Sequence, residues 1–150
     1  MQVILDISKK RLLEEVAQRT GYTGAKMPGE VDVYDRIATI DEDHPELMQF
    51  FDEVRVDVVT ALSDMLAAEN ADPNDDRYNI ELDLQGFNTA KRPAMELALF
   101  NTFLYGILGR WYLLTNKEEA AAYSTMATTT LDLLKSNLMN KVFTRKGCGF

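Results

Sequence analysis

The pattern of hydrophobic and polar residues predicts helices along most of the chain, with one clear exception at residues 78–84. This segment reads Tyr-Asn-Ile-Glu-Leu-Asp-Leu, and its strict alternation of apolar and polar positions is typical of a half-buried strand. A strand needs a neighbouring strand because its backbone N–H and C=O groups must be paired. Residues 1–7 are the only other strand-like stretch, so we expect pairing either with them or with another copy of the chain.

Apolar residues spaced three and four apart predict the helices. Ser8 is expected to cap the first one, and Gly21 and Gly24 are expected to end it in a loop. Asp43 followed by Pro45 marks the start of a long amphipathic helix. The expected helices cover residues 8–20, 33–40, 45–69, about 86–114, and the stretch after residue 115 up to about residue 138.

The helix near residues 86–114 is unusually apolar. From residue 95 onward its only charged side chains are Glu96 and Arg110, so most of its surface must be buried. Its uncharged stretch, 97–109, is shorter than the roughly 20 residues that a membrane span needs, which favours a central core helix. A Thr-Asn-Lys-Glu capping box at 115–118 then predicts a sharp break and a C-terminal helical hairpin.

Composition fits one folded domain over residues 1–150. The chain is 46% hydrophobic and 27% charged, which is ordinary for a folded protein. Residues 1–7 run into an amphipathic segment without a cleavage-site pattern, and a single cysteine cannot form an internal disulfide, so we do not expect secretion. The predicted fold class is mainly α: a helical bundle with a long central apolar helix and a C-terminal helical hairpin, plus one short β-strand or hairpin.

The net charge of −8 is unevenly distributed. Residues 30–83 carry seventeen acidic and three basic side chains, whereas the final segment, about 141–150, forms a basic tail. An acidic centre argues against binding a phosphate backbone, because nucleic-acid affinity comes from Lys and Arg. It suits a basic partner surface or a wall past which nucleic acid slides without binding; the simplest alternative is a solvated helix face.

The residue types do not assemble a catalytic or metal-binding motif. His44 is the only histidine and stands at a helix start, and Cys148 lies between two glycines without a nearby base. Asp72 begins a segment that imitates a calcium-binding loop, but Arg77 stands where that loop requires glycine, and Asp83 replaces the final glutamate. The sequence therefore predicts no enzyme activity, no cofactor and no metal ion.

The chain resembles small virion proteins of tailed bacteriophages of gut bacteria, of the head-to-tail connector (adaptor) type. The resemblance rests on the strand at 78–84, Phe87-Asn88 opening an apolar helix, the segment Gly-Arg-Trp-Tyr-Leu-Leu-Thr-Asn-Lys-Glu-Glu-Ala at 109–120, and the stretches 22–26 and 34–37. It implies a non-catalytic, ring-forming subunit of the phage neck that contacts portal, tail or stopper proteins. The implied location is the virion neck, with the host cytoplasm during assembly; DNA passes nearby without specific binding, and no membrane is involved.

Strand, apolar helix and tail together supply the candidate subunit interface of a homo-oligomer. The alternative is a monomeric acidic binding or regulatory module that engages a basic protein partner. The candidate interface residues are Tyr78, Ile80, Leu82, Leu84, Trp111, Tyr112, Lys141, Phe143, Arg145, Lys146 and Phe150.

Overall fold

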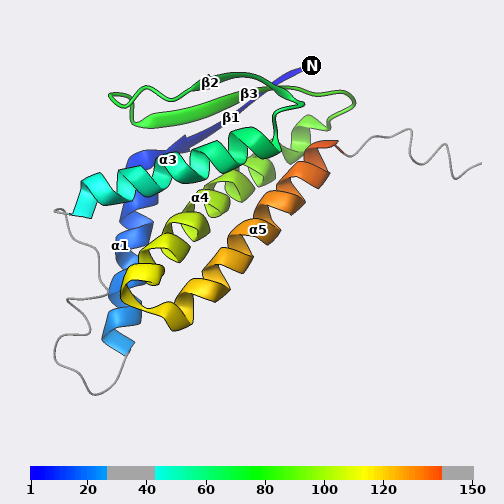
Figure 1. The fold of residues 1–150 in the computed structure, drawn as a ribbon. Helices are drawn as coiled ribbons and strands as arrows, with labels where there is room; N and C mark the ends of the chain where they lie inside the picture. The colour runs from blue at the N-terminus through cyan, green and yellow to red at the C-terminus, as the bar shows by residue number, and fades with distance from the viewer. Residues whose placement is uncertain (27–42, 140–150) are drawn as a thin grey trace, which may run out of the picture.

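The computed structural model describes residues 1–26 and 43–139, with side chains described from 1–21 and 43–139 (Figure 1). A small sheet lies across one side of a group of long helices, and the mainly helical class is confirmed. The elements are β1 (Gln2–Ser8), α1 (Lys9–Lys26), α3 (His44–Ala61), β2 (Leu66–Asn70), β3 (Arg77–Asp83), the 3-10 turn η2 (Thr89–Lys91), α4 (Arg92–Thr115) and α5 (Lys117–Met139).

The sheet is antiparallel with strand order β1-β3-β2. β1 pairs with β3 so that Leu5 stands opposite Ile80, which settles the pairing of the predicted strand within the chain. β2 pairs with the other side of β3, where Glu69 stands opposite Ile80. Because both edges of β3 are occupied, this strand has no free edge for another copy of the chain.

One face of the sheet forms part of the core. The alternating residues of β1 and β3 that face the helices are buried, while their neighbours are wholly or partly exposed. An aromatic cluster joins the layers: the Phe51 ring of α3 stacks on Phe103 of α4 at 4.7 Å, and Tyr78 of β3 meets both rings edge-on. The buried sheet residues are Val3, Leu5, Ile7, Tyr78, Ile80 and Leu82.

The outer edge of β1 is covered by two side chains from the first turns of α4. Arg92 Nε donates to the Ile4 carbonyl at 2.9 Å, and the Asp6 N–H donates to Glu96 Oε2 at 2.8 Å. Arg92 and Glu96 also form an ion pair at 3.3 Å, one helical turn apart. These side chains satisfy backbone groups that an edge strand otherwise presents to other chains.

Three helix boundaries differ from the prediction. The helix expected from about residue 86 begins at Arg92, after the turn η2. The helix expected over 45–69 ends at Ala61, and residues 66–70 form β2 instead. The first helix continues through Gly21 and Gly24 to Lys26, although Ser8 caps it as predicted by accepting the Arg11 N–H at 3.2 Å. The helix expected at 33–40 lies outside the described residues.

α4 is the central helix and is buried on most of its surface. By length and composition Thr89–Thr115 is sufficient to cross a membrane, but 61% of its most apolar window is buried inside this chain, as in core helices of soluble proteins. Two glycines allow close helix contacts. A Cβ at Gly106 would lie 2.6 Å from a methyl group of Val54 in α3, and one at Gly109 would lie 3.0 Å from Ser124 Oγ in α5.

Candidate functional site

The candidate interface residues divide into a buried set and a set outside the described residues. All four from the strand segment, Tyr78, Ile80, Leu82 and Leu84, have side chains buried in this chain's own core, as do Trp111 and Tyr112. The prediction that these six form a contact surface is therefore corrected: packing against the chain's own helices accounts for their burial. Lys141, Phe143, Arg145, Lys146 and Phe150 belong to the tail that the structure does not describe.

The exposed apolar surface lies instead on α5, which packs mainly against α4 at the side of the molecule (Figure 1). Its outward positions recur at spacings of four and three, as in the seam of a helix that packs against another helix. Leu133 is 59% exposed and Met126 is 38% exposed. No charged residue occurs from 120 to 131. We call the following exposed residues the outer face of α5: Ala122, Met126, Thr129, Leu133 and Ser136.

Three threonine hydroxyls of α5, at positions outside the outer face, are bonded within the helix. Thr125, Thr128 and Thr130 donate their hydroxyl protons to backbone carbonyls four residues earlier, at 2.7–3.1 Å. A hydroxyl that is already bonded within its helix needs less from solvent. Covering these three positions of α5 therefore costs less desolvation than covering free hydroxyls would.

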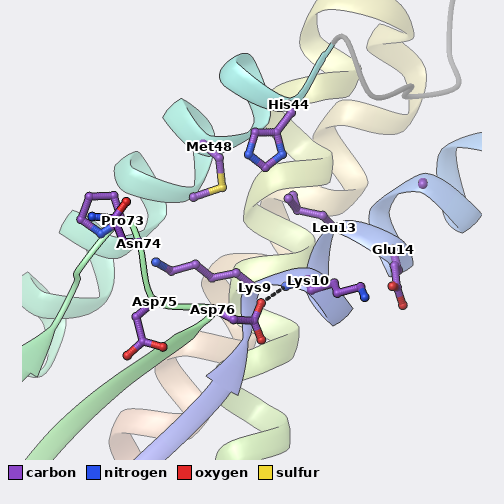
Figure 2. A pocket seen from close by; sticks show the side chains of 11 residues that line it. Lys9, Lys10, Leu13, Glu14, His44, Met48, Pro73, Asn74, Asp75 and Asp76 are labelled. Atoms are coloured by element: carbon purple, nitrogen blue, oxygen red, sulfur yellow. Dashed lines mark hydrogen bonds between the residues drawn. The ribbon is translucent and has the colours of Figure 1, made fainter.

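A cavity of about 560 Å³ lies between the start of α1, the start of α3 and the turn before β3 (Figure 2). Lys9 is buried there, and its ammonium donates to the Asp72 carbonyl at 2.9 Å and lies 5.8 Å from the Phe51 ring centre. Figure 2 shows Lys9 extending toward the turn at Pro73 and Asn74, whereas Lys10 points the opposite way. The two lysines therefore do not converge on one ligand position.

The two aspartates of this cavity are used to hold the backbone. Asp76 accepts from the Lys10 N–H at 2.9 Å and from the Ser8 hydroxyl at 2.8 Å, which fixes the start of α1. Asp75 accepts from the Arg77 N–H at 3.0 Å and from the Asn70 amide at 3.0 Å. These hydrogen bonds hold the pKa of both carboxyls below the usual value. The oxygen-rich segment that begins at Asp72 and imitates a calcium loop is therefore a turn held by hydrogen bonds from its own side chains.

A partly buried ionic network joins α3 to the sheet. Glu69 accepts from Arg55 Nη1 at 2.8 Å and from the Tyr78 hydroxyl at 2.6 Å. Burial, reinforced by the hydrogen bond with Glu69 and its negative charge, raises the pKa of Tyr78 far above its usual value of 10. This tyrosine therefore stays protonated and acts as a hydrogen-bond donor inside the core.

Part of the acidic charge in the middle of the chain is neutralised internally. Arg110 of α4 pairs with Glu53 at 3.2 Å and with Asp57 at 3.0 Å, both on α3. Asp52 lies 3.5 Å from Arg55. The acidic side of α3 is therefore less negative than the sequence alone indicates.

A cleft of about 490 Å³ lies where α5 ends beside the sheet. Its walls are largely apolar, and its two charged lining residues, Asp64 and Asp83, are both acidic. Met139, the last described residue, is part of the lining. We call this the end cleft; its lining includes Asp64, Leu66, Ala67, Asp83, Leu84, Leu138 and Met139.

Comparison with known proteins gives no relative: no family model, no curated protein and no solved structure matches this chain. Within the described residues, no group of three or more potential metal-ligating side chains gathers at one place. The outer face of α5 had a signal in the sequence, namely the uncharged run 120–131. The two cavities had none, because each combines segments that are distant along the chain.

Proposed function

We propose that this chain is a structural, ring-forming subunit of the head-to-tail connector of a tailed phage. In this proposal the helices act as a bundle whose C-terminal hairpin, α4 and α5, presents the outer face of α5 to a neighbouring subunit. The single observation that carries it is that face: a long uncharged helix surface with Met126 and Leu133 exposed. The resemblance in layout described above supplies the phage context.

A closed ring of identical subunits is built from one interface that repeats between neighbouring subunits. In a closed ring the outer face of α5 meets a different surface of the next subunit, so that each copy uses both surfaces once. Leu113 and Leu114, at the end of α4, are also exposed. Fully burying an exposed leucine contributes about 1.5–3 kcal/mol, and Leu133, which is 59% exposed, can supply only part of that.

The test is the mass of the purified protein by light scattering, alone and with a phage portal protein, together with negative-stain imaging. We expect an oligomer or a portal-bound ring for the natural chain, and loss of assembly for the double variant Met126→Glu/Leu133→Glu. Leu97→Glu is the matched control, because Leu97 is 54% exposed on another helix. Assembly that survives the double variant contradicts the role of α5.

A monomeric acidic module that engages a basic protein is the other outcome of this test. A chain that stays monomeric with every neck component and binds a basic partner only at low salt would support that alternative. The ion pairs of Arg110 with Glu53 and Asp57 count against it, because the one positive charge offsets part of the negative charge offered to a basic partner.

A further inference from the structure

We infer that the basic tail, about residues 141–150, binds in the end cleft of its own chain. The tail begins at the mouth of this cleft, because Met139 both lines the cleft and precedes the tail. At about 3.3 Å per extended residue the tail can cover a few tens of ångströms, which is ample to turn back over the cleft. This inference concerns a different surface from the outer face of α5 and does not depend on the proposed function.

Charge complementarity selects the tail as the occupant. Lys141, Arg145 and Lys146 give the tail three positively charged side chains, and it has no acidic side chain. The charged side chains lining the end cleft are Asp64 and Asp83, both negative. Asp83 is 69% exposed beside the N-terminal ammonium at 3.4 Å, an exposed pair that a tail cation can replace or join.

The apolar part of the cleft matches the middle of the same segment. Val142 and Phe143 stand between the tail's first and second basic residues. Leu66, Leu84 and Leu138 line the cleft alongside the two aspartates. A volume of about 490 Å³ falls in the range of pockets that hold small organic groups.

Tethering makes the chain's own tail the favoured occupant over a tail from another copy. A segment joined directly to the cleft has an effective concentration in the millimolar range, which exceeds the concentration of free copies in most solutions. Weak contacts are therefore sufficient for occupancy. Bound in this way, the tail covers Met139, which is 43% exposed at the end of α5, and lies beside Leu66, the first residue of β2.

The single cysteine provides the experiment. Cys148 lies in the tail, and no other cysteine occurs, so a nitroxide spin label can be attached there to the full natural chain. We expect the label to reduce the amide NMR signals of Leu66, Ala67 and Leu84 by more than half. Signals from the α4–α5 connection, at the opposite end of α5, should be unchanged.

Two controls separate the possible results. In Asp64→Lys/Asp83→Lys the broadening should disappear, whereas Glu14→Lys/Glu118→Lys, with the same charge change elsewhere, should keep it. A mixture of spin-labelled chain without isotope and isotope-labelled chain without spin label reports contacts between copies only. Three results would overturn the inference: no broadening in the natural chain, broadening that persists in Asp64→Lys/Asp83→Lys, or broadening that occurs only in the mixture of chains. Light scattering on the same samples reports assembly separately, so failure here and failure of the proposed function are distinguishable.

Discussion

Replacing Tyr78 by phenylalanine tests the partly buried network between α3 and the sheet. The substitution removes only the hydroxyl that donates to Glu69 Oε2 at 2.6 Å. The ring keeps its edge-on contacts with Phe51 and Phe103, at 5.5 and 5.3 Å between centres. Packing is therefore conserved, and the measured difference reports the hydrogen bond.

The magnitude follows from the charge of the acceptor. A hydrogen bond to a charged group contributes about 1.5–3 kcal/mol, more than one between neutral groups. Glu69 keeps its ion pair with Arg55 after the substitution, so we expect a loss of about 2 kcal/mol in the free energy of unfolding. For a chain of this size that corresponds to a fall in Tm of roughly 4–8 °C.

The same hydroxyl predicts a dependence of stability on alkaline pH. The pKa of Tyr78 is raised in the folded protein, so the stability that its hydroxyl contributes is fully present below pH 10, the usual pKa that applies to the unfolded chain. Above that pH the unfolded chain loses the proton while the folded chain keeps it. Stability therefore falls with rising pH, by about 1.4 kcal/mol per pH unit from this group. The phenylalanine variant lacks this contribution to the slope.

Urea unfolding followed by circular dichroism between pH 7 and 11 measures both effects. Tyr105→Phe is the matched control, because the hydroxyl of this half-buried tyrosine donates no hydrogen bond within the described part of the chain. It should change stability by less than about 0.5 kcal/mol. A Tyr78→Phe variant as stable as the natural protein, with an unchanged alkaline slope, would refute the reasoning.

Three further substitutions test local features. Gly106→Ala should destabilise by about 1–2 kcal/mol in urea unfolding, since crowding against Val54 outweighs the gain in helix propensity; unchanged stability would mean that α3 shifts freely. Asp76→Ala should cost about 1 kcal/mol at neutral pH by uncapping α1. The pKa of Asp76 is lowered in the folded protein, so this carboxyl makes the natural protein lose stability as pH falls below the usual aspartate pKa of 3.8. The variant should lack this part of the loss; an identical acid profile in both proteins contradicts the prediction. Arg92→Ala should cost less than about 1 kcal/mol but speed amide exchange along the outer edge of β1, and unchanged exchange would show that the edge needs no cover.

The sequence predicted the elements whose hydrophobic pattern matches the way they are buried in the fold. β3 alternates strictly, and α4 is apolar around its circumference, so both were found. β2 was missed because Leu-Ala-Ala-Glu-Asn contains no β-branched or aromatic residue, and Leu66 continues the helical spacing of α3. The second edge of β3 recruits this segment as a strand, and a pairing partner outweighs local propensity there.

The candidate site was harder to predict than the fold. Tyr78 was predicted as an interface residue because its strand needs a partner, and Trp111 because aromatic residues often form contact surfaces. Both side chains are buried within this chain. Whether an apolar helix is covered by its own chain depends on which helices lie beside it. α4 is covered on most sides, whereas α5 is covered mainly by α4, and the two sequences alone do not reveal that difference.

The pairing of β1 with β3 imposes an order of events during synthesis. Leu5 leaves the ribosome first, but its partner Ile80 follows only 75 positions later. At about 5–20 residues per second, β1 waits roughly 4–15 s for the strand that covers its edge. Throughout that interval a Val-Ile-Leu-Asp-Ile segment is exposed and able to pair with other nascent chains. α4 and α5, by contrast, are adjacent in the chain and can join within the time of their own synthesis, so we expect aggregation during expression to arise from β1.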